Sequence, residues 1–421
     1  MKHSEDVLRQ VALATRLREG SVGVEGFLRQ LHRESPLPIG ELARRLGWPV
    51  PVTAAVRGEL ERAGLVARTP GGAALSAAGQ ALACGVLGLS AREDSLCPTC
   101  AGRRIYVDPA RWETLLARLE EVHRRNPTVD TTLDQSHGTP ETALRRALAM
   151  YREGALEGRD VLILGDDDLV SVAIGLLEAT GGKGEAGKGD DGIRTRRLTV
   201  IDVDERFLAH IVAAGKEFGF SVEVVKHDLR EPLPEDLKAA SDTVETDPPY
   251  TLAGLQLFLS RALQALRPGS GRDVFLSFAP RDPASQRALL EVCVDLGLAP
   301  YSVTPDFNRY VGAGTLGGSS QFLHLRTTAE AGPATPRPRS GLGEDLTVAG
   351  RYAGPLYTME ERLAQGKIGG PAVRAYRCLA CGAEVRVGPG GNFATIETLK
   401  ERGCPQCGGK RFRAGRKGSR E

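Results

Sequence analysis

The sequence predicts an α/β protein built around a doubly wound, mostly parallel sheet, with a smaller domain before it and another after it. Residues 161–164 form a short apolar run that ends at Gly165, and a helical pattern of apolar residues resumes at 169–177. A strand, a tight turn and a helix in this order are typical of parallel sheets whose strands are buried on both faces. With 421 residues, the chain is also longer than a single domain usually is.

Charge is distributed unevenly along the chain, although the formal net charge is only +2. Residues 161–250 carry 19 acidic and 10 basic side chains, whereas residues 367–421 carry 12 basic and 4 acidic ones. The middle of the chain therefore favours cationic ligands, and the end favours an anionic surface. No run of 18 apolar residues occurs and residues 1–20 contain no apolar signal core, so we expect a cytoplasmic protein without a membrane partner.

The first domain, expected at 1–125, resembles a winged helix-turn-helix. Helical patterns occur at 4–17, 38–46 and 52–63, with a turn at 48–51 between the last two, and a short hairpin is expected at 65–75. The helix in the recognition position carries only Arg57 and Arg62 as cations, and Glu59 and Glu61 lie beside them. We therefore expect this domain to pack or to form a homodimer, with nucleic acid as the less favoured partner.

Cys97 and Cys100 form a Cys-x-x-Cys pair near the end of this domain. Two cysteines do not complete a zinc site, which normally has four ligands. A structural, a redox and a metal role all remain open for them.

A polar loop at 130–137 precedes the central strand. Thr139 in a cap position and Pro140 in the first turn predict a helix start, which places Asp134, Gln135 and His137 just before the helix. These side chains could overhang a cofactor, or they could be solvent-exposed, and their spacing does not decide between the two.

Beyond the first strand the alternation continues. Strands are expected at 198–201, 222–225, 243–246 and 274–278, and a closing antiparallel pair at 300–304 and 321–325. This pattern indicates a methyltransferase-like Rossmann domain with seven strands at 126–328. Glu245 is unusual, because central parallel strands are normally apolar.

The turn after the first strand carries Asp166, Asp167 and Asp168, where a binder of phosphate or carboxylate would carry a Gly-x-Gly motif. Three carboxylates at this point should repel an anion and attract a cation. Asp202, at the end of the second strand, is in the usual place of a ribose-binding acid, with Asp204 two residues later. Asp228 follows the third strand, where we expect it to lie near an adenine.

The motif Asp247-Pro248-Pro249-Tyr250 follows the fourth strand. In amino-group methyltransferases, the carboxylate and a proline carbonyl accept hydrogen bonds from the attacking amine, and the aromatic ring packs beside it. The alternative is a strand end that is merely stiffened by proline. S-adenosylmethionine carries a carboxylate that the three aspartates would repel, whereas decarboxylated S-adenosylmethionine ends in an ammonium that they would attract. The group transferred to the amine would then be aminopropyl.

On these residues the sequence resembles the branched-chain polyamine synthases, aminopropyltransferases of thermophiles. The resemblance covers roughly 7–326 and is carried by 133–137, 164–169, 200–206, 227–230, 247–251 and 306–310. It implies transfer of aminopropyl groups from decarboxylated S-adenosylmethionine to the secondary amine of spermidine. A second transfer gives quaternary N(4)-bis(aminopropyl)spermidine, and methylthioadenosine is released each time.

We accordingly expect three overlapping groups of site residues. Asp166 should hold the ammonium of the donor, and Asp167 or Asp168 should accept the proton of the amine. The catalytic group is Asp166, Asp167, Asp168, Asp247 and Tyr250; the donor-binding group is Gly165, Asp134, Gln135, Asp202, Asp204, Asp228 and Pro248; the acceptor-binding group is His137, Asp167, Asp168, Asp247 and Tyr250. Two alternatives remain: a nucleic-acid amino-methyltransferase, and a regulator whose Rossmann domain only senses a ligand. The three aspartates favour the aminopropyltransferase, because a methyl donor has no use for them.

A zinc ribbon is expected at 369–421, after a linker at 329–368. Two Cys-x-x-Cys-Gly motifs supply Cys378, Cys381, Cys404 and Cys407, which predicts one structural zinc. Residues 181–192 are expected to form a flexible insertion, and 410–420 a basic tail. Because no catalytic motif lies beyond the linker, we expect catalysis to survive truncation near Leu346.

Overall fold

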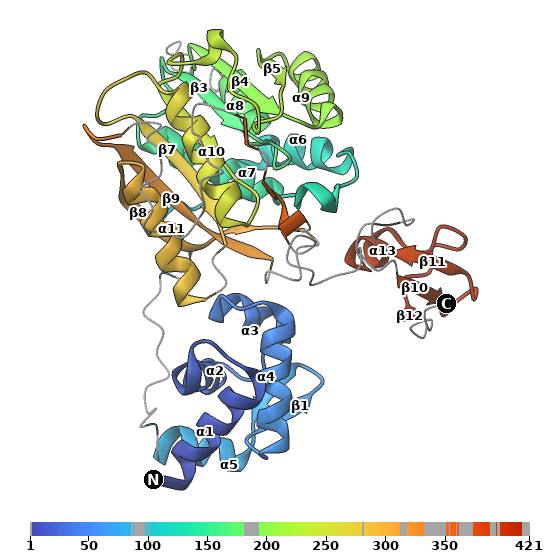
Figure 1. The fold of residues 1–421 in the computed structure, drawn as a ribbon. Helices are drawn as coiled ribbons and strands as arrows, with labels where there is room; N and C mark the ends of the chain where they lie inside the picture. Colours follow the sequence, from blue (N-terminus) through green and yellow to red (C-terminus); the bar gives the residue numbers. More distant parts are fainter. Residues whose placement is uncertain are drawn as a thin grey trace.

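The computed structural model covers Met1–Glu421 and describes residues 2–85, 87, 97, 99–100, 102–180, 193–279, 282–311, 318–331, 351–352, 354–358, 360–361, 374–387, 393 and 396–414. The predicted insertion at 181–192, residues 332–350, 353, 359 and 362–368 of the predicted linker, and residues 415–420 of the basic tail lie outside the described residues. Figure 1 shows three bodies: an N-terminal helical domain, a central sheet domain and a small C-terminal domain.

The N-terminal domain has the predicted winged-helix order. Its elements are α1 (Lys2–Thr15), α2 (Gly20–Arg33), α3 (Ile39–Leu46), α4 (Val50–Arg62), β1 (Val66–Thr69), β2 (Gly72–Leu75) and α5 (Ala77–Gly85). The strands β1 and β2 pair antiparallel as the wing. Phe27, Leu28 and Leu31, from α2, lie in the centre of its apolar core, although the sequence analysis did not anticipate α2 or α5.

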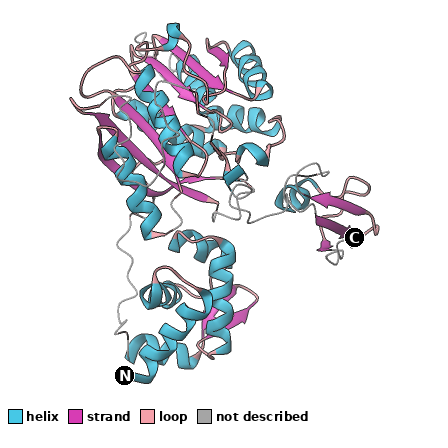
Figure 2. Ribbon diagram, viewed as in Figure 1, coloured by secondary structure: helices cyan, strands magenta, loops and turns pink. Residues whose placement is uncertain are grey.

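The central sheet has seven strands in the order β5-β4-β3-β6-β7-β9-β8. Figure 2 shows these strands with helices packed around them. All neighbours are parallel except β9, which pairs antiparallel with both β7 and β8. The strands are β3 (Asp160–Leu164), β4 (Arg197–Asp202), β5 (Glu223–Lys226), β6 (Thr243–Thr246), β7 (Asp273–Phe278), β8 (Leu298–Arg309) and β9 (Ser319–Thr327).

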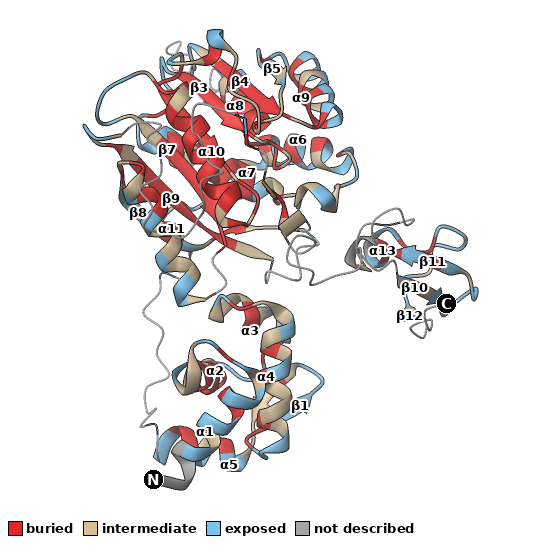
Figure 3. Cartoon of the chain, in the orientation of Figure 1, coloured by how far each residue is buried: buried red, intermediate tan, exposed pale blue. Residues whose placement is uncertain are grey.

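Helices cover both faces of the sheet, and each face has its own apolar cluster. Leu162 and Leu164 of β3 pack with the helices of one face, whereas Val161 and Ile163 pack with those of the other, because successive strand residues point to opposite sides. Figure 3 shows the sheet as the most deeply buried part of the molecule. The helices are α6 (Glu113–Arg124), η1 (Thr131–Leu133), α7 (Pro140–Arg152), α8 (Val170–Thr180), α9 (Glu205–Phe218), η2 (Glu235–Leu237), α10 (Leu252–Ala265) and α11 (Pro283–Asp295).

Part of the segment expected to be a linker returns to the sheet domain. Tyr352, Leu356 and Tyr357 are buried in the same apolar cluster as α10. The Tyr352 amide donates to the Arg230 carbonyl over 2.8 Å, and the Thr251 hydroxyl donates to the Leu356 carbonyl over 2.7 Å. The assignment of 329–368 as a plain linker is therefore wrong for this stretch, whose apolar side chains complete the core.

The C-terminal domain is a three-stranded sheet with one helix. It contains β10 (Arg374–Cys378), β11 (Glu384–Val387), α13 (Ile396–Arg402) and β12 (Phe412–Ala414), with strand order β11-β10-β12. Among the described residues of this domain, the buried apolar cluster consists of Cys378, Val385, Val387, Leu399 and Cys404. So small a core needs an additional source of stability.

Candidate active site

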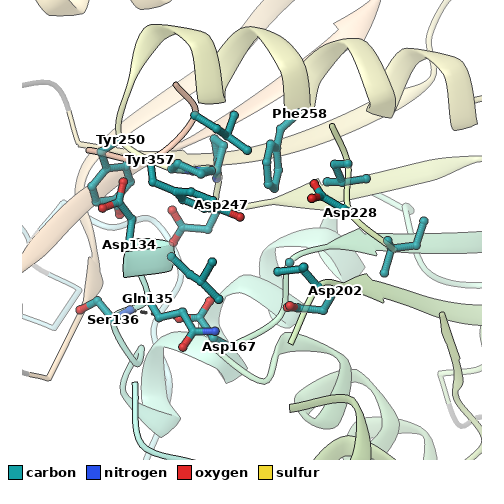
Figure 4. Close-up of a pocket in the computed structure, with 18 of the residues that line it drawn as sticks. Asp134, Gln135, Ser136, Asp167, Asp202, Asp228, Asp247, Tyr250, Phe258 and Tyr357 are labelled. Carbon is teal, nitrogen blue, oxygen red and sulfur yellow. Dashed lines mark hydrogen bonds between the residues drawn. The ribbon is translucent and has the colours of Figure 1, made fainter. Parts of the chain in front are cut away.

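A pocket opens at the carboxyl ends of β3, β4, β5 and β6, where parallel α/β sheets bind their ligands. In Figure 4, Asp202 and Asp228 lie on one side of the view and Tyr250 on the other, with Asp167 and Asp247 between them. The full lining is Leu133, Asp134, Gln135, Ser136, Gly165, Asp167, Ile201, Asp202, Val203, His227, Asp228, Leu229, Asp247, Pro248, Pro249, Tyr250, Phe258, Tyr310, Leu356 and Tyr357.

The three consecutive aspartates have three different surroundings. Asp167 lines the pocket, whereas Asp166 and Asp168 do not. The Asp166 carboxylate accepts hydrogen bonds from the amides of Val170 and Ser171, over 2.6 and 3.1 Å. It therefore caps the first turn of α8 and does not line the pocket, and its expected role beside the ammonium of the donor stays a prediction.

Asp168 points toward the helix α7. Its Oδ1 accepts a hydrogen bond from the Gly138 amide, and its Oδ2 lies 2.8 Å from Arg146 Nη1. With both oxygens engaged away from the pocket, Asp168 is less suited than Asp167 to accept a proton from a substrate.

Asp167 presents its carboxylate to the pocket and accepts one hydrogen bond from protein, from the Ser136 amide over 3.0 Å. Burial, and then the neighbouring charges of Asp168, Asp202 and Asp247, raise the pKa of Asp167 well above its ordinary value. A carboxylate held in this way has a stronger affinity for protons than an exposed one, as a general base near neutral pH requires.

Arg146 is the cation at the centre of this cluster. It lies on α7 and is only 1 % exposed. Its guanidinium is 2.8 Å from Asp168, 3.4 Å from Glu245 and 2.8 Å from Asp247. Although burial opposes the charge, these acidic neighbours raise the pKa of Arg146 well above its ordinary value. One buried cation thus faces three carboxylates, which leaves the cluster short of positive charge.

Sequence analysis did not identify Arg146, although Glu245 was a signal for it. A carboxylate in the middle of a buried strand is costly unless a cation or a proton neutralises it. Glu245 is 1 % exposed, and burial raises its pKa well above the ordinary value even though Arg146 opposes that rise. The unusual residue therefore indicated a buried basic partner that the sequence analysis left unassigned.

Asp247 and Tyr310 form the second polar wall of the pocket. The Tyr310 hydroxyl donates to Asp247 Oδ2 over 2.6 Å, and Arg146 Nη2 donates to the same oxygen over 2.8 Å. Burial raises the pKa of Asp247 to about 7, with Arg146 opposing the rise. Beside it, the Tyr250 ring packs edge-on against Phe278, with centroids 5.4 Å apart. Tyr310 was quoted in the family motif but was not among the expected site residues.

Two of the acids expected to bind the donor lie at the opposite end of the pocket. Asp202 accepts hydrogen bonds from the amides of Asp204 and Asp166, over 2.8 and 3.1 Å, which fix its orientation, and burial raises its pKa. Burial alone would raise the pKa of Asp228 as well. The hydrogen bonds that Asp228 accepts from Arg230 outweigh this effect, and the pKa of Asp228 is lowered. Gly165, Asp134, Gln135 and Pro248 also line the pocket, as expected.

Asp204 and His137 lie outside this lining. Asp204 caps α9 and is paired with Arg206, while Gln135 also donates to it over 3.0 Å. His137 faces a second cavity behind the loop, next to His123 and Asn126. Burial lowers the pKa of His137 to about 4, so its imidazole is neutral near pH 7. This arrangement therefore disfavours direct contact of Asp204 or His137 with substrate.

The segment that returns to the sheet domain, described at 351–352, 354–358 and 360–361 and called the returning segment below, forms a wall of the pocket that the sequence analysis missed. Leu356 and Tyr357 line the pocket, and the Thr358 amide donates to the Asp134 carboxylate over 2.8 Å. A proline- and glycine-rich stretch precedes these residues, so local pattern gave no sign that the chain would come back.

The four cysteines of the C-terminal domain come together as predicted. Their sulfur atoms all lie within 4.8 Å of one another, with Cys378 and Cys407 Sγ 3.7 Å apart and Cys381 and Cys404 Sγ 3.6 Å apart. A tetrahedral zinc with Zn–S bonds of about 2.3 Å separates its sulfurs by roughly 3.8 Å. This geometry fits one structural zinc and is too wide for disulfides.

Fold and pocket together define a class: an α/β transferase with a methyltransferase-like sheet and an acidic site. The family model "Branched-chain polyamine synthase A C-terminal domain" matches residues 114–322, and the "DprA winged helix domain" model matches 24–72. An N(4)-bis(aminopropyl)spermidine synthase of Thermococcus kodakarensis is 32% identical over 63% of this chain and 72% of its own length. The chain belongs to the branched-chain polyamine synthase family.

Two further similarities cover more of the chain. An uncharacterized protein of Methanocaldococcus jannaschii is 32% identical over 97% of this chain and 92% of its own length. A crystal structure of a Thermus thermophilus branched-chain polyamine synthase mutein, in complex with N4-aminopropylspermidine and 5'-methylthioadenosine, is similar with a TM-score of 0.62 and 26% identity, over 86% of this chain and 98% of the other. In the described part of the chain, no helix is both long and apolar enough to cross a membrane.

Proposed function

We propose that this protein transfers aminopropyl groups from decarboxylated S-adenosylmethionine to the secondary amine of spermidine. The products are N(4)-aminopropylspermidine and then N(4)-bis(aminopropyl)spermidine, with methylthioadenosine released at each step. The related proteins named above support this substrate class, and one of them is described with both N4-aminopropylspermidine and methylthioadenosine bound.

The observation that carries the proposal is the charge of the pocket. Five aspartates line it, Asp134, Asp167, Asp202, Asp228 and Asp247, and none of the described lining residues is lysine or arginine. A polyamine and the ammonium of the decarboxylated donor are both cations, which such a lining attracts. A methyl donor that carries a carboxylate would be repelled by the Asp167 side chain. A nucleic-acid amino-methyltransferase is therefore the less favoured function.

In the reaction, the lone pair of the acceptor nitrogen attacks the methylene carbon next to the sulfonium of the donor. The carbon–sulfur bond breaks, and its electrons neutralise the sulfur as methylthioadenosine leaves. A protonated amine has no lone pair for this attack, so it must first lose a proton. We assign that proton to Asp167. Asp247, fixed by Arg146 and Tyr310, orients the nitrogen, and the Tyr250 ring packs against its alkyl arms.

The second transfer follows the same course. Once Asp167 has released the first proton to solvent, the tertiary ammonium formed in the first step loses its own proton to that carboxylate. The resulting tertiary amine attacks a second donor molecule, the carbon–sulfur bond of that donor breaks, and the nitrogen becomes quaternary. The quaternary product bears no N–H at that nitrogen, and the negative pocket compensates its permanent charge. We place the donor adenosine between Asp202 and Asp228, with Leu356 and Tyr357 covering it.

Incubation of the protein with decarboxylated S-adenosylmethionine and spermidine, followed by mass detection of products, tests the proposal. We expect singly and then doubly aminopropylated spermidine, with one methylthioadenosine per transfer. S-adenosylmethionine in place of its decarboxylated form is the matched control and should give no methylated polyamine. Methylation without aminopropyl transfer would overturn the proposal. The homodimer and the cytoplasmic location are part of the same proposal, and light scattering of the purified protein tests the former.

A further inference from the structure

The N-terminal domain is connected to the catalytic centre through Asp306. This residue lies on β8 at an irregularity in its pairing with β9, between Thr304 and Asn308, and its φ is +53°. Its carboxylate pairs with Arg44 of α3, with Arg103 at 3.4 Å and with Arg309. The Arg103 side chain also donates to the Asp306 carbonyl over 2.8 Å. Asp306 is therefore held by arginines from different parts of the chain.

Arg44 is the one of these that belongs to the winged-helix domain. It is oriented by Glu41, one turn earlier on α3, which also pairs with Arg45. Burial alone would raise the pKa of Glu41. The hydrogen bonds from Arg44 and Arg45 outweigh this effect and lower the pKa of Glu41 to about 2. Arg44 and Asp306 are 21% and 23% exposed as side chains, so the pair is shielded better than an ordinary surface ion pair.

The residues that follow Asp306 along β8 lead directly to the active site. Asn308 is fully buried, and its Oδ1 accepts a hydrogen bond from Arg146 over 2.9 Å. Two residues later, Tyr310 donates its hydroxyl to Asp247. Asp306 is the irregular position from which the chain continues to Asn308 and then to Tyr310, just beyond the end of β8. A shift of the backbone at Asp306 is therefore carried to the contacts that Asn308 and Tyr310 make with the catalytic cluster.

The orientation of the winged helix supports an internal role. Trp48, Pro49 and Val52, at the start of α4, line a cleft together with Tyr250 and Asp282 of the sheet domain. In DNA-binding helix-turn-helix proteins, the first residues of this helix contact the bases. Here that end of α4 faces the sheet domain, on the same side as α3 (Figure 1).

We propose that the winged-helix domain positions the active site, with the Arg44–Asp306 ion pair setting the placement of Tyr310 against Asp247. Arg44 and Asp306 are positioning residues, because neither lines the pocket. The inference rests on the proposed function for its kinetic test, but not for its structural test.

The kinetic test compares two ion pairs that join the same two domains. Arg18 pairs with Asp282 at the start of α11, away from β8, and its side chain is 72% exposed against 21% for Arg44, so Arg18→Gln is the matched control for Arg44→Gln. Arg44→Gln should lower turnover at least about tenfold, because displacement of a contact by ~1 Å can cost up to ~100-fold. The KM for the donor should stay unchanged, since Asp202 and Asp228 are at the other end of the pocket. Arg44→Lys should restore part of the turnover, and Arg18→Gln should keep it.

Asp306→Asn tests the pair from the other side. Asparagine tolerates a positive φ, so this variant removes the charge while retaining the backbone conformation. If the pair acts as a unit, the double variant with Arg44→Gln should lose little more turnover than either single variant. Additive losses, or equal losses in Arg18→Gln, would overturn the inference.

Hydrogen exchange provides the structural test and needs no turnover. Amides at 307–310 should exchange faster in Arg44→Gln than in the wild type, and should be unchanged in Arg18→Gln. If the wild type transfers no aminopropyl group but this difference is seen, the proposed function fails and the positioning role stands. Unchanged exchange in Arg44→Gln would refute the positioning role even in an active enzyme.

Discussion

Arg146 and Asp247 form a buried ion pair in which guanidinium Nη2 and carboxylate Oδ2 are 2.8 Å apart. The same arginine also faces Asp168 and Glu245. Because these acidic groups share one cation and are buried, the pKa values of Glu245 and Asp247 are raised, which favours their protonated forms. In the proposed function, a bound polyamine supplies further positive charge and so favours the ionised carboxylates.

Replacing Arg146 by methionine should therefore destabilise the fold strongly. The change leaves buried carboxylates without a cation, a situation that typically costs about 3–5 kcal/mol. Denaturant unfolding of Arg146→Met against wild type measures the effect. Arg196→Met is the control, because Arg196 pairs with Asp160 at a site where the arginine is 58% exposed, and it should change stability by less than ~1 kcal/mol. Similar losses of unfolding free energy in both variants would show that the buried acidic cluster does not depend on Arg146 for its stability.

Asp167→Asn should lower turnover by at least ~100-fold, the usual scale for a general base, with little change in binding of the donor. Asp166→Asn is the informative comparison, because Asp166 caps α8 and does not line the pocket. It should cost about 1 kcal/mol of stability, as the weakening of a helix cap does, and retain most of the turnover. If Asp167→Asn stays near-normal while Asp247→Asn is inactive, the proton acceptor is Asp247.

Spermidine should stabilise the protein more at pH 8 than at pH 5. The pKa values of Asp166 and Asp247 are both raised to about 7, chiefly by burial. Carboxyl groups with raised pKa contribute stability that is fully present below their unfolded value of about 4 and is lost as the pH rises through about 7. A bound cation offsets this loss because it favours the ionised carboxylates. The stabilisation is measured as the rise in the thermal unfolding midpoint on addition of spermidine at pH 5 and at pH 8. An equal rise at both pH values would contradict the charge argument.

Asp202→Ala should raise the KM for the donor far more than the KM for the acceptor, since we place the ribose diol at Asp202. Asp204→Asn is the control: Asp204 lies outside the pocket lining and caps α9, so its loss should leave the donor KM near the wild-type value. An unchanged donor KM in Asp202→Ala would remove this residue from the donor site.

Two truncations separate the returning segment from the zinc ribbon. A chain that ends after Leu346 lacks Leu356 and Tyr357, which line the pocket, and it should lose most of its activity, contrary to the expectation from sequence alone. A chain that ends after Ala364 keeps both and should remain active. Metal analysis should find one zinc per full chain and none in either truncation. Zinc retained in either truncation would exclude the four cysteines as its only ligands, and full activity after Leu346 would exclude the segment from the site.

Much of the site could be predicted because its motifs are local. The aspartates after β3, the Asp-Pro-Pro-Tyr motif after β6 and the four cysteines each lie within a few residues of a recognisable turn. The direction of each side chain could not be predicted in the same way. Consecutive Asp166, Asp167 and Asp168 point toward a helix cap, the pocket and Arg146, and only the tertiary structure separates them.

Arg146 and Tyr357 were missed for different physical reasons. On α7, Arg146 follows Arg145, and nothing local distinguishes the arginine that is inserted among carboxylates from the one that pairs with Glu141 at the helix edge. Tyr357 and its neighbour Leu356 are far along the chain from the other pocket residues. Its role depends on tertiary contacts of the returning segment, which single-sequence periodicity does not report.

The returning segment also separates two events in the life of the chain. The central sheet is complete once β9 has been synthesised, but the pocket acquires its last wall only when Leu356 and Tyr357 emerge from the ribosome and dock beside α10. Between these moments the nascent protein has its fold without its closed site. A single peptide-bond cleavage between β9 and Tyr352 would leave the sheet intact and make retention of that wall depend on non-covalent docking alone.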